Sequence, residues 1–143
     1  ELGFRTVVDL RYGDIKDSEY DLPRALGLDI VRIPIRDGRP PQSEQLAKFL
    51  ATVRAGSTPV FVHCGAGVGR TGSLSAAYLV STNKASPHTA MLTSLAVGPP
   101  TLEQISFMRR LPPGGPISDP PTLVEVVSRA LDAPRQLWSW LIH

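Results

Sequence analysis

The sequence predicts an α/β fold in which helices flank a central, mostly parallel and twisted sheet. Three short runs rich in β-branched residues are bounded by glycine, proline or charged residues, as buried strands tend to be. These runs cover Thr6–Leu10, Ile30–Ile33 and Pro59–His63. Segments with apolar residues at helical spacing lie between and after them, so at least one strand–helix–strand unit is expected.

Two helices are expected before the third strand. The first, Ser18–Leu26, links the first two strands and is interrupted by Pro23, which removes a backbone donor. For the second helix, we expect Ser43 to be the cap and Gly56 to end it. The apolar residues of this second helix recur at helical spacing: Leu46, Phe49, Leu50 and Val53.

Three more helices are expected after the third strand. A helix of small and apolar residues covers Thr71 to about Thr82. Ser86-Pro87 combines an N-cap with proline at the first helical position, and it opens a helix to about Val97. The last of the three covers Thr101–Leu111, because its apolar residues lie on one stripe and a proline follows.

We expect one domain, residues 1–111, followed by a Pro/Gly-rich linker and a C-terminal helical appendage over residues 112–143. A chain of 143 residues with 42% hydrophobic content can build a single core. The appendage ends in Trp138 and Trp140, which we expect to pack on that core; the alternative is a contact with another chain. Because Glu1–Arg5 lead into a strand with no cap or turn, one or more further strands are expected before residue 1.

Composition narrows the class of protein. The net charge of +2 suits an anionic ligand but is too small for a nucleic-acid-binding protein. No apolar stretch approaches the roughly 20 residues of a membrane span. The single cysteine, Cys64, fits a reducing compartment, so a cytoplasmic location is expected. Zinc-ligand spacing is absent with one cysteine and three scattered histidines, so we expect no metal and no cofactor. The sequence does not indicate the oligomeric state.

A glycine-rich loop follows the third strand, between Cys64 and Arg70. In open α/β sheets, ligands sit beyond the carboxyl ends of strands, where a starting helix offers unpaired N–H groups to an anion. Five residues can curl there so that their N–H groups surround a phosphate: Gly65, Ala66, Gly67, Val68 and Gly69. Arg70 can donate two parallel hydrogen bonds to phosphoryl oxygens and keeps its charge at any ordinary pH.

Cys64 is expected to be a nucleophile, since a thiol at a helix N-terminus beside a cation ionises readily. The alternative is a small buried hydrophobe, which the glycines, Arg70 and Thr71 together argue against. Thr71 can start the helix, and its hydroxyl can also stabilise the thiolate. His63 is expected to orient its surroundings rather than act as the base, because it points away from the loop; a core histidine with satisfied hydrogen bonds is the alternative.

The run HCGAGVGRTG, from His63 to Gly72, resembles the signature loop of the protein-tyrosine phosphatase superfamily. The order of elements over about Leu2–Leu111 resembles the small dual-specificity branch. This resemblance implies a phosphomonoester hydrolase that works through a phosphocysteine intermediate. Thiosulfate sulfurtransferases have a shorter cysteine loop, and low-molecular-weight phosphatases carry theirs at the amino end, so neither matches this chain.

The resemblance also implies an acid and a water-directing residue. Asp37, in the run Ile33–Pro41, matches the acid loop and is expected to protonate the leaving group, although Asp-Gly also suits a surface turn. Gln104 matches a glutamine that directs the water of the second step. The alternative for Gln104 is a capping box with Thr101. Arg11, just beyond the first strand, is expected to be a solvated charge outside the site; the alternative is that it faces the same edge of the cleft.

The function expected is that of a protein tyrosine/dual-specificity phosphatase, acting on a phosphorylated protein or a small phosphoester. One alternative is a phosphoinositide phosphatase, but that branch tends to have lysines in the loop, and the residues between Cys64 and Arg70 are neutral. A second alternative is a module that binds phosphorylated partners without hydrolysing them. Such a module would not need Cys64, Asp37 and Thr71 together.

Overall fold

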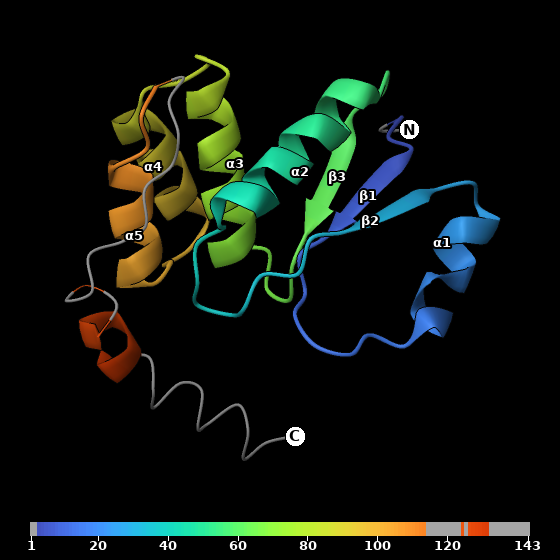
Figure 1. Cartoon of the computed structure of the whole chain (residues 1–143), viewed down its shortest axis with the longest axis horizontal. Coiled ribbons are helices and arrows are strands. Elements are labelled where there is room, and N and C mark those ends of the chain that lie inside the picture. The colour runs from blue at the N-terminus through green and yellow to red at the C-terminus, as the bar shows by residue number, and fades with distance from the viewer. Residues whose placement is uncertain (1–2, 114–123, 125, 132–143) are drawn as a thin grey trace.

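The predicted α/β fold is confirmed. The structure, a computed structural model, describes residues 3–113, 124 and 126–131. Three strands, β1 (Thr6–Asp9), β2 (Asp29–Arg32) and β3 (Val60–His63), form a parallel sheet in the order β2-β1-β3 (Figure 1). Each strand lies within one residue of its predicted position, because short β-branched runs between turn residues define it locally.

The carboxyl ends of the three strands are level with one another. Asp9 at the end of β1 pairs in register with Arg32 of β2 and with His63 of β3. These ends converge beside the first turn of the helix that follows β3 (Figure 1). In parallel α/β sheets this edge is where ligands bind, so the register places the ends of β1, β2 and β3 at one potential site.

The segment between β1 and β2 is a short 3-10 helix η1 (Asp17–Tyr20) followed by α1 (Asp21–Ala25). Pro23 is the third residue of α1, where its missing N–H costs no helical hydrogen bond, so it does not interrupt the turn. Gly27 ends this segment with a φ of 75°, in the left-handed region that favours glycine.

Helix α2 (Ser43–Ala55) connects β2 to β3 and lies across one face of the sheet (Figure 1). The predicted cap at Ser43 is wrong by one residue, since Gln42 is the N-cap and Ser43 the first helical residue. The reason is a capping box, in which Gln45 Oε1 accepts a 2.7 Å hydrogen bond from Gln42 N. The end of the helix before Gly56 is confirmed.

Between β3 and residue 113, three helices pack against one another beside the sheet (Figure 1): α3 (Gly69–Ser81), α4 (Pro87–Val97) and α5 (Leu102–Arg109). Helix α3 begins two residues before the predicted Thr71, so the end of the glycine-rich loop is already helical. The Ser86 cap of α4 and the Thr101 cap of α5 are confirmed. The core between sheet and helices includes Val8, Leu10, Ile33, Ile35, Phe49, Leu74, Val80, Phe107 and Met108.

Much of the predicted appendage, including Trp138 and Trp140, lies outside the described residues. Residues 124 and 126–131 are helical, and Ser128 in this segment is buried. Its hydroxyl accepts a 3.2 Å hydrogen bond from the backbone N of Glu103 in α5. Within the described part of the chain, no helix is long and apolar enough to cross a membrane.

Candidate active site

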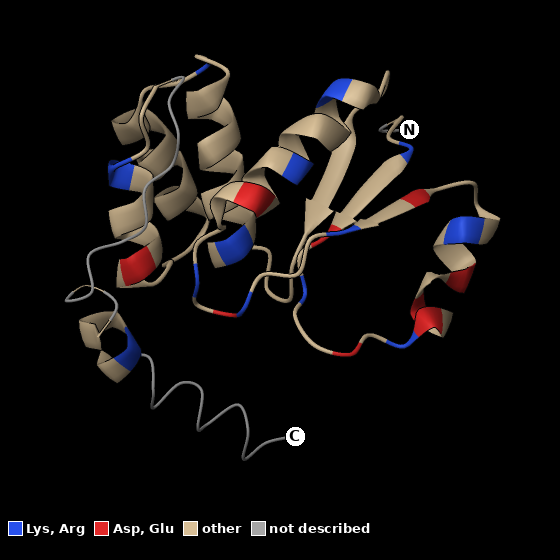
Figure 2. Cartoon of the chain, viewed as in Figure 1, with Lys and Arg blue, Asp and Glu red and all other residues tan. Residues whose placement is uncertain are grey.

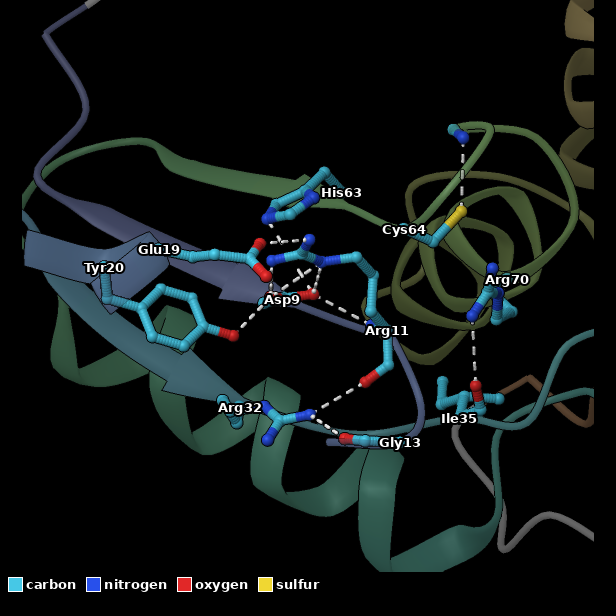
Figure 3. Close-up of polar contacts among 11 residues, drawn as sticks. Asp9, Arg11, Gly13, Glu19, Tyr20, Arg32, Ile35, His63, Cys64 and Arg70 are labelled. Atoms are coloured by element: carbon cyan, nitrogen blue, oxygen red, sulfur yellow. Dashed lines mark hydrogen bonds and ion pairs between the residues drawn. The ribbon is translucent and has the colours of Figure 1, made fainter. Parts of the chain in front are cut away.

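The loop between β3 and α3 curls around the sulfur of Cys64. Gly67 has a φ of 72°, a conformation that a side chain would strain, and its N–H donates to Cys64 Sγ over 3.2 Å (Figure 3). Because α3 begins at Gly69, its first unpaired N–H groups also lie next to the loop. The loop therefore presents backbone donors to an anion placed at the sulfur.

Arg70 folds back from the first turn of α3 to the start of the same loop. Its Nη1 donates to the carbonyl of Ile35 over 3.3 Å, and its Nη2 lies 3.1 Å from Asp37 Oδ1. A Cβ at Gly65 would lie 3.1 Å from that Nη2, so glycine lets the guanidinium group approach the loop. Arg70 Nε is buried without a hydrogen-bond partner among the described residues. The guanidinium group thus has donor capacity beyond its protein contacts.

The surroundings of Cys64 lower the pKa of its thiol below the ordinary value. Burial raises this pKa, but the Thr71 hydroxyl and N–H, the hydrogen bond from the Gly67 N–H and the charge of Arg70 together outweigh it. Thr71 Oγ1 is buried and has no hydrogen-bond partner among the described residues, so its hydroxyl is free to orient toward the Cys64 sulfur, whose pKa it lowers. The structure therefore brings Cys64, Arg70 and Thr71 together.

The structure also brings Asp37 to this group from the loop after β2. Its side chain is 82% exposed and contacts Arg70, as the ion pair above shows. The tight turn that carries it is closed by a 3.1 Å hydrogen bond from Arg39 N to Arg36 O, with Gly38 at a φ of 77°. Charged residues of both signs lie along this loop (Figure 2). Asp37-Gly38 thus forms a surface turn, as one interpretation predicted, and the same turn places Asp37 beside Arg70.

Gln104 is buried at the start of α5 and adopts the capping-box geometry. Its Oε1 accepts from Thr101 N over 3.0 Å, and its N–H donates to Thr101 Oγ1 over 3.3 Å. Its Nε2 donates to the carbonyl of Arg39 over 3.1 Å. Since both ends of the amide bond to the protein, a water-directing role for Gln104 stays a prediction.

His63 turns away from the cysteine and toward the end of β1. Its Nε2 lies 3.9 Å from Asp9 Oδ1, and its ring stacks on Phe61 with centroids 5.9 Å apart. Figure 3 shows the imidazole beside the side chains of Asp9 and Arg11, on the side away from the Cys64 sulfur. This orientation agrees with the prediction that His63 is not the base, while an orienting role for it stays a prediction.

Asp9, which no sequence motif marks as a site residue, lies fully buried at the end of the central strand. Arg11 donates to both carboxylate oxygens from Nε and Nη2, and Tyr20 Oη donates over 2.6 Å (Figure 3). Burial raises the pKa of Asp9, but these hydrogen bonds outweigh it and bring the pKa to about 2. The prediction that Arg11 is a solvated charge is wrong, because its guanidinium group binds the buried carboxylate of Asp9 and also pairs with Glu19 at 2.8 Å.

One signal could have found this cluster. Asp9 and Arg11 are two residues apart, which places both side chains on one face of an extended chain. An acid in a buried strand needs a partner, and an arginine at that spacing can supply it. Among the described residues, no group of three or more His, Cys, Asp or Glu side chains could hold a metal ion.

Comparison with known proteins agrees with this fold. The solved structure of Tk-PTP in its active form is similar with a TM-score of 0.60 and 28% identity, over 76% of this chain and 78% of that one. The architecture is that of the cysteine-dependent tyrosine and dual-specificity phosphatases. A family model described as "DSP-PTPase phosphatase fused to NAD+ Kinase" matches residues 1–110, and the chain belongs to this family.

Two curated relatives are similar to this chain, one a plant NAD kinase and the other a viral phosphatase. The chain is 39% identical over 80 residues to the chloroplastic NAD kinase 2 of Arabidopsis thaliana, which is 52% of this chain and 8% of that protein. It is 33% identical over 90 residues to a dual specificity protein phosphatase of vaccinia virus, which is 60% of this chain and 49% of that protein. The match thus spans about half of the viral phosphatase and a small part of the plant kinase.

Proposed function

We propose that the chain hydrolyses phosphomonoesters through a phosphocysteine intermediate, as a protein tyrosine/dual-specificity phosphatase. One observation carries the proposal: Asp37 from the loop after β2 contacts Arg70, whose loop also holds the low-pKa thiol of Cys64. A nucleophile, an anion cradle and an acid therefore meet at the carboxyl edge of the sheet.

In the first step the Cys64 thiolate attacks phosphorus, and the bond from phosphorus to the leaving oxygen breaks. The loop N–H groups and Arg70 donate to the phosphoryl oxygens, where charge spreads in the transition state. Arg70 Nη2 also binds Asp37. When a phosphoryl group accepts the hydrogen bond from this Nη2, the carboxyl group of Asp37 is freed from Arg70 and lies beside the leaving oxygen. Asp37, in its protonated form, then gives its proton to that oxygen.

In the second step a water molecule attacks the phosphocysteine, and the Asp37 carboxylate accepts its proton. The sulfur leaves as a thiolate, and inorganic phosphate is released. The Gly67 N–H and the Thr71 hydroxyl, which lower the pKa of Cys64, make this sulfur a better leaving group. The same contacts therefore serve attack in the first step and departure in the second.

The neutral residues between Cys64 and Arg70 favour phosphoproteins or small phosphoesters over crowded polyanions such as phosphoinositides. A substrate panel tests this choice: phosphotyrosine and phosphoserine/threonine peptides, a phosphoinositide, and NADP+, which is included because the family description names a fused NAD+ kinase. We expect phosphate release from the phosphopeptides to be the fastest.

Two variants test the chemistry. Cys64→Ser should abolish phosphate release while binding of the phosphopeptide is retained, and turnover that persists in this variant would refute the proposal. Asp37→Asn should lose most turnover on poorly activated leaving groups but much less on p-nitrophenyl phosphate, whose leaving group needs little protonation. Equal losses on both substrates would remove Asp37 as the acid. Binding of phosphopeptide by the wild type with no phosphate release would identify a binding module instead.

A further inference from the structure

The N-terminus of α5 contacts the turn that carries Asp37 at two places on its backbone. Thr101 Oγ1 donates to the carbonyl of Gly38 over 2.7 Å, and Gln104 Nε2 donates to the carbonyl of Arg39 over 3.1 Å. Both acceptors lie within two residues of Asp37 in the chain. The backbone after Asp37 is therefore fixed to α5, although the Asp37 side chain itself is largely exposed.

The same end of α5 also contacts the phosphate loop. A Cβ at Gly69 would lie 2.9 Å from Gln104 Nε2 and closer still to its Oε1, so Gln104 packs directly on the backbone where α3 begins. The next residue along α3 is Arg70. Gln104 thus lies between the loop that binds the phosphoryl group and the turn that carries the acid, and it fixes their spacing.

An ion pair reinforces this contact. Arg39 Nη1 lies 3.2 Å from Glu103 Oε1, and the Glu103 side chain is only 3% exposed. Burying a carboxylate costs free energy unless a cation and hydrogen bonds compensate the lost hydration. The Arg39 cation therefore stabilises the charged side chain of Glu103. The ion pair therefore opposes movement of Arg39, and with it of the turn that bears Asp37.

We propose that Glu103 is a positioning residue for the proposed reaction: through Arg39, and together with Thr101 and Gln104, it holds Asp37 where it can protonate the leaving group of a phosphoester bound at Arg70. This inference rests on the proposed phosphatase function. Glu103 takes no part in bond breaking. Its role is to set the position of Asp37, and so the geometry of the proton transfer. A small displacement of such a group can cost about 100-fold in rate.

The test is Glu103→Gln, which keeps the size of the side chain and removes its charge. We expect kcat on a phosphotyrosine peptide to fall by about 10- to 100-fold, as a displaced acid would cause. We expect kcat on p-nitrophenyl phosphate and the inhibition constant of inorganic phosphate to change much less, because Cys64 and Arg70 keep their contacts. Equal losses on both substrates would overturn the inference, since they would indicate general damage to the site.

A double variant separates positioning from structure. With Asp37→Asn already present, the acid is gone, so adding Glu103→Gln should cost no further activity on the peptide. A further loss there would refute the inference. Arg39→Gln breaks the ion pair from its more exposed partner and should give the same pattern of losses, so the test remains possible if Glu103→Gln fails to fold. Wild-type activity of Arg39→Gln on the peptide would count against the inference.

Two controls complete the design. Asp17→Asn removes an exposed acid that pairs with Arg24 at 2.9 Å, and it should leave both activities at the wild-type level. A failure of the proposed function has a different appearance: wild type would then release no phosphate in a Cys64-dependent manner from any substrate. A failure of the positioning role would leave that release intact and change only its response to Glu103→Gln.

Discussion

Replacing Asp9 by asparagine should reduce the stability of the protein at neutral pH and weaken the dependence of that stability on acid. Asp9 lies fully buried at the end of β1, and the side chains of Arg11 and Tyr20 donate to its carboxylate. Burial raises its pKa, but these donors hold the pKa at about 2, below the 3.8 expected of an unfolded chain. The folded protein therefore favours the charged form of Asp9.

The magnitude follows from the difference between these two values. A pKa lowered from 3.8 to about 2 corresponds to about 2 to 3 kcal/mol of folding free energy, at roughly 1.4 kcal/mol per pKa unit. Since the folded pKa is the lower one, this contribution is complete above about pH 5 and is lost as the pH falls from there through 2. Asparagine resembles the protonated acid, so the variant should lack about this amount at pH 7.

Urea denaturation at several pH values between 7 and 3 measures the effect. The difference in unfolding free energy between wild type and Asp9→Asn should be largest at pH 7 and should shrink steadily below pH 4. A difference that stays constant over this range would show that the charge of Asp9 is not what stabilises the fold. Asp17→Asn is the matched control, because its ion pair with Arg24 is exposed and should contribute little.

Two further substitutions probe the loop. Thr71→Val removes the hydroxyl that lowers the pKa of Cys64 and should move the pH dependence of its alkylation by iodoacetamide upward, whereas Thr71→Ser should not; an unchanged profile in Thr71→Val would argue against the hydroxyl. Gly69→Ala places a Cβ against the amide of Gln104 and should lower both melting temperature and kcat, whereas Gly72→Ala, whose Cβ would lie 3.3 Å from a Ser94 carbon, should be milder; equal effects of the two would contradict the close approach.

The fold and the phosphate loop could be predicted from the sequence because their signals are local. Each strand is a short β-branched run between turn residues, and the helix caps at Ser86 and Thr101 depend on residues within one turn. The loop likewise depends on glycines and on an arginine a few residues from Cys64. The exception at Ser43 is also local: a capping box centred one residue earlier on Gln42 shifts the start of the helix.

Contacts between distant residues were not predictable in this way. The ion pair of Arg39 and Glu103 joins residues 64 positions apart, and nothing in the neighbourhood of either residue indicates the other. The pair of Asp9 and Arg11 is close in sequence, yet its meaning depends on Asp9 being fully buried, which follows from packing. A charged side chain that is expected from the sequence to be solvated can therefore stabilise the fold instead, where a parallel sheet buries the ends of its strands.

Gln104 shows how a local motif acquires a role between distant elements. The local pattern Thr101-x-x-Gln104 predicts a capping box, and that box is present. Because the box commits Oε1 to the Thr101 N–H, the amide can present only Nε2 to the other side, where the Arg39 carbonyl lies. The orientation that caps the helix is thus the one that binds the acid turn. Capping and the contact with the Asp37 turn are therefore compatible at Gln104, while the water-directing role stays a prediction.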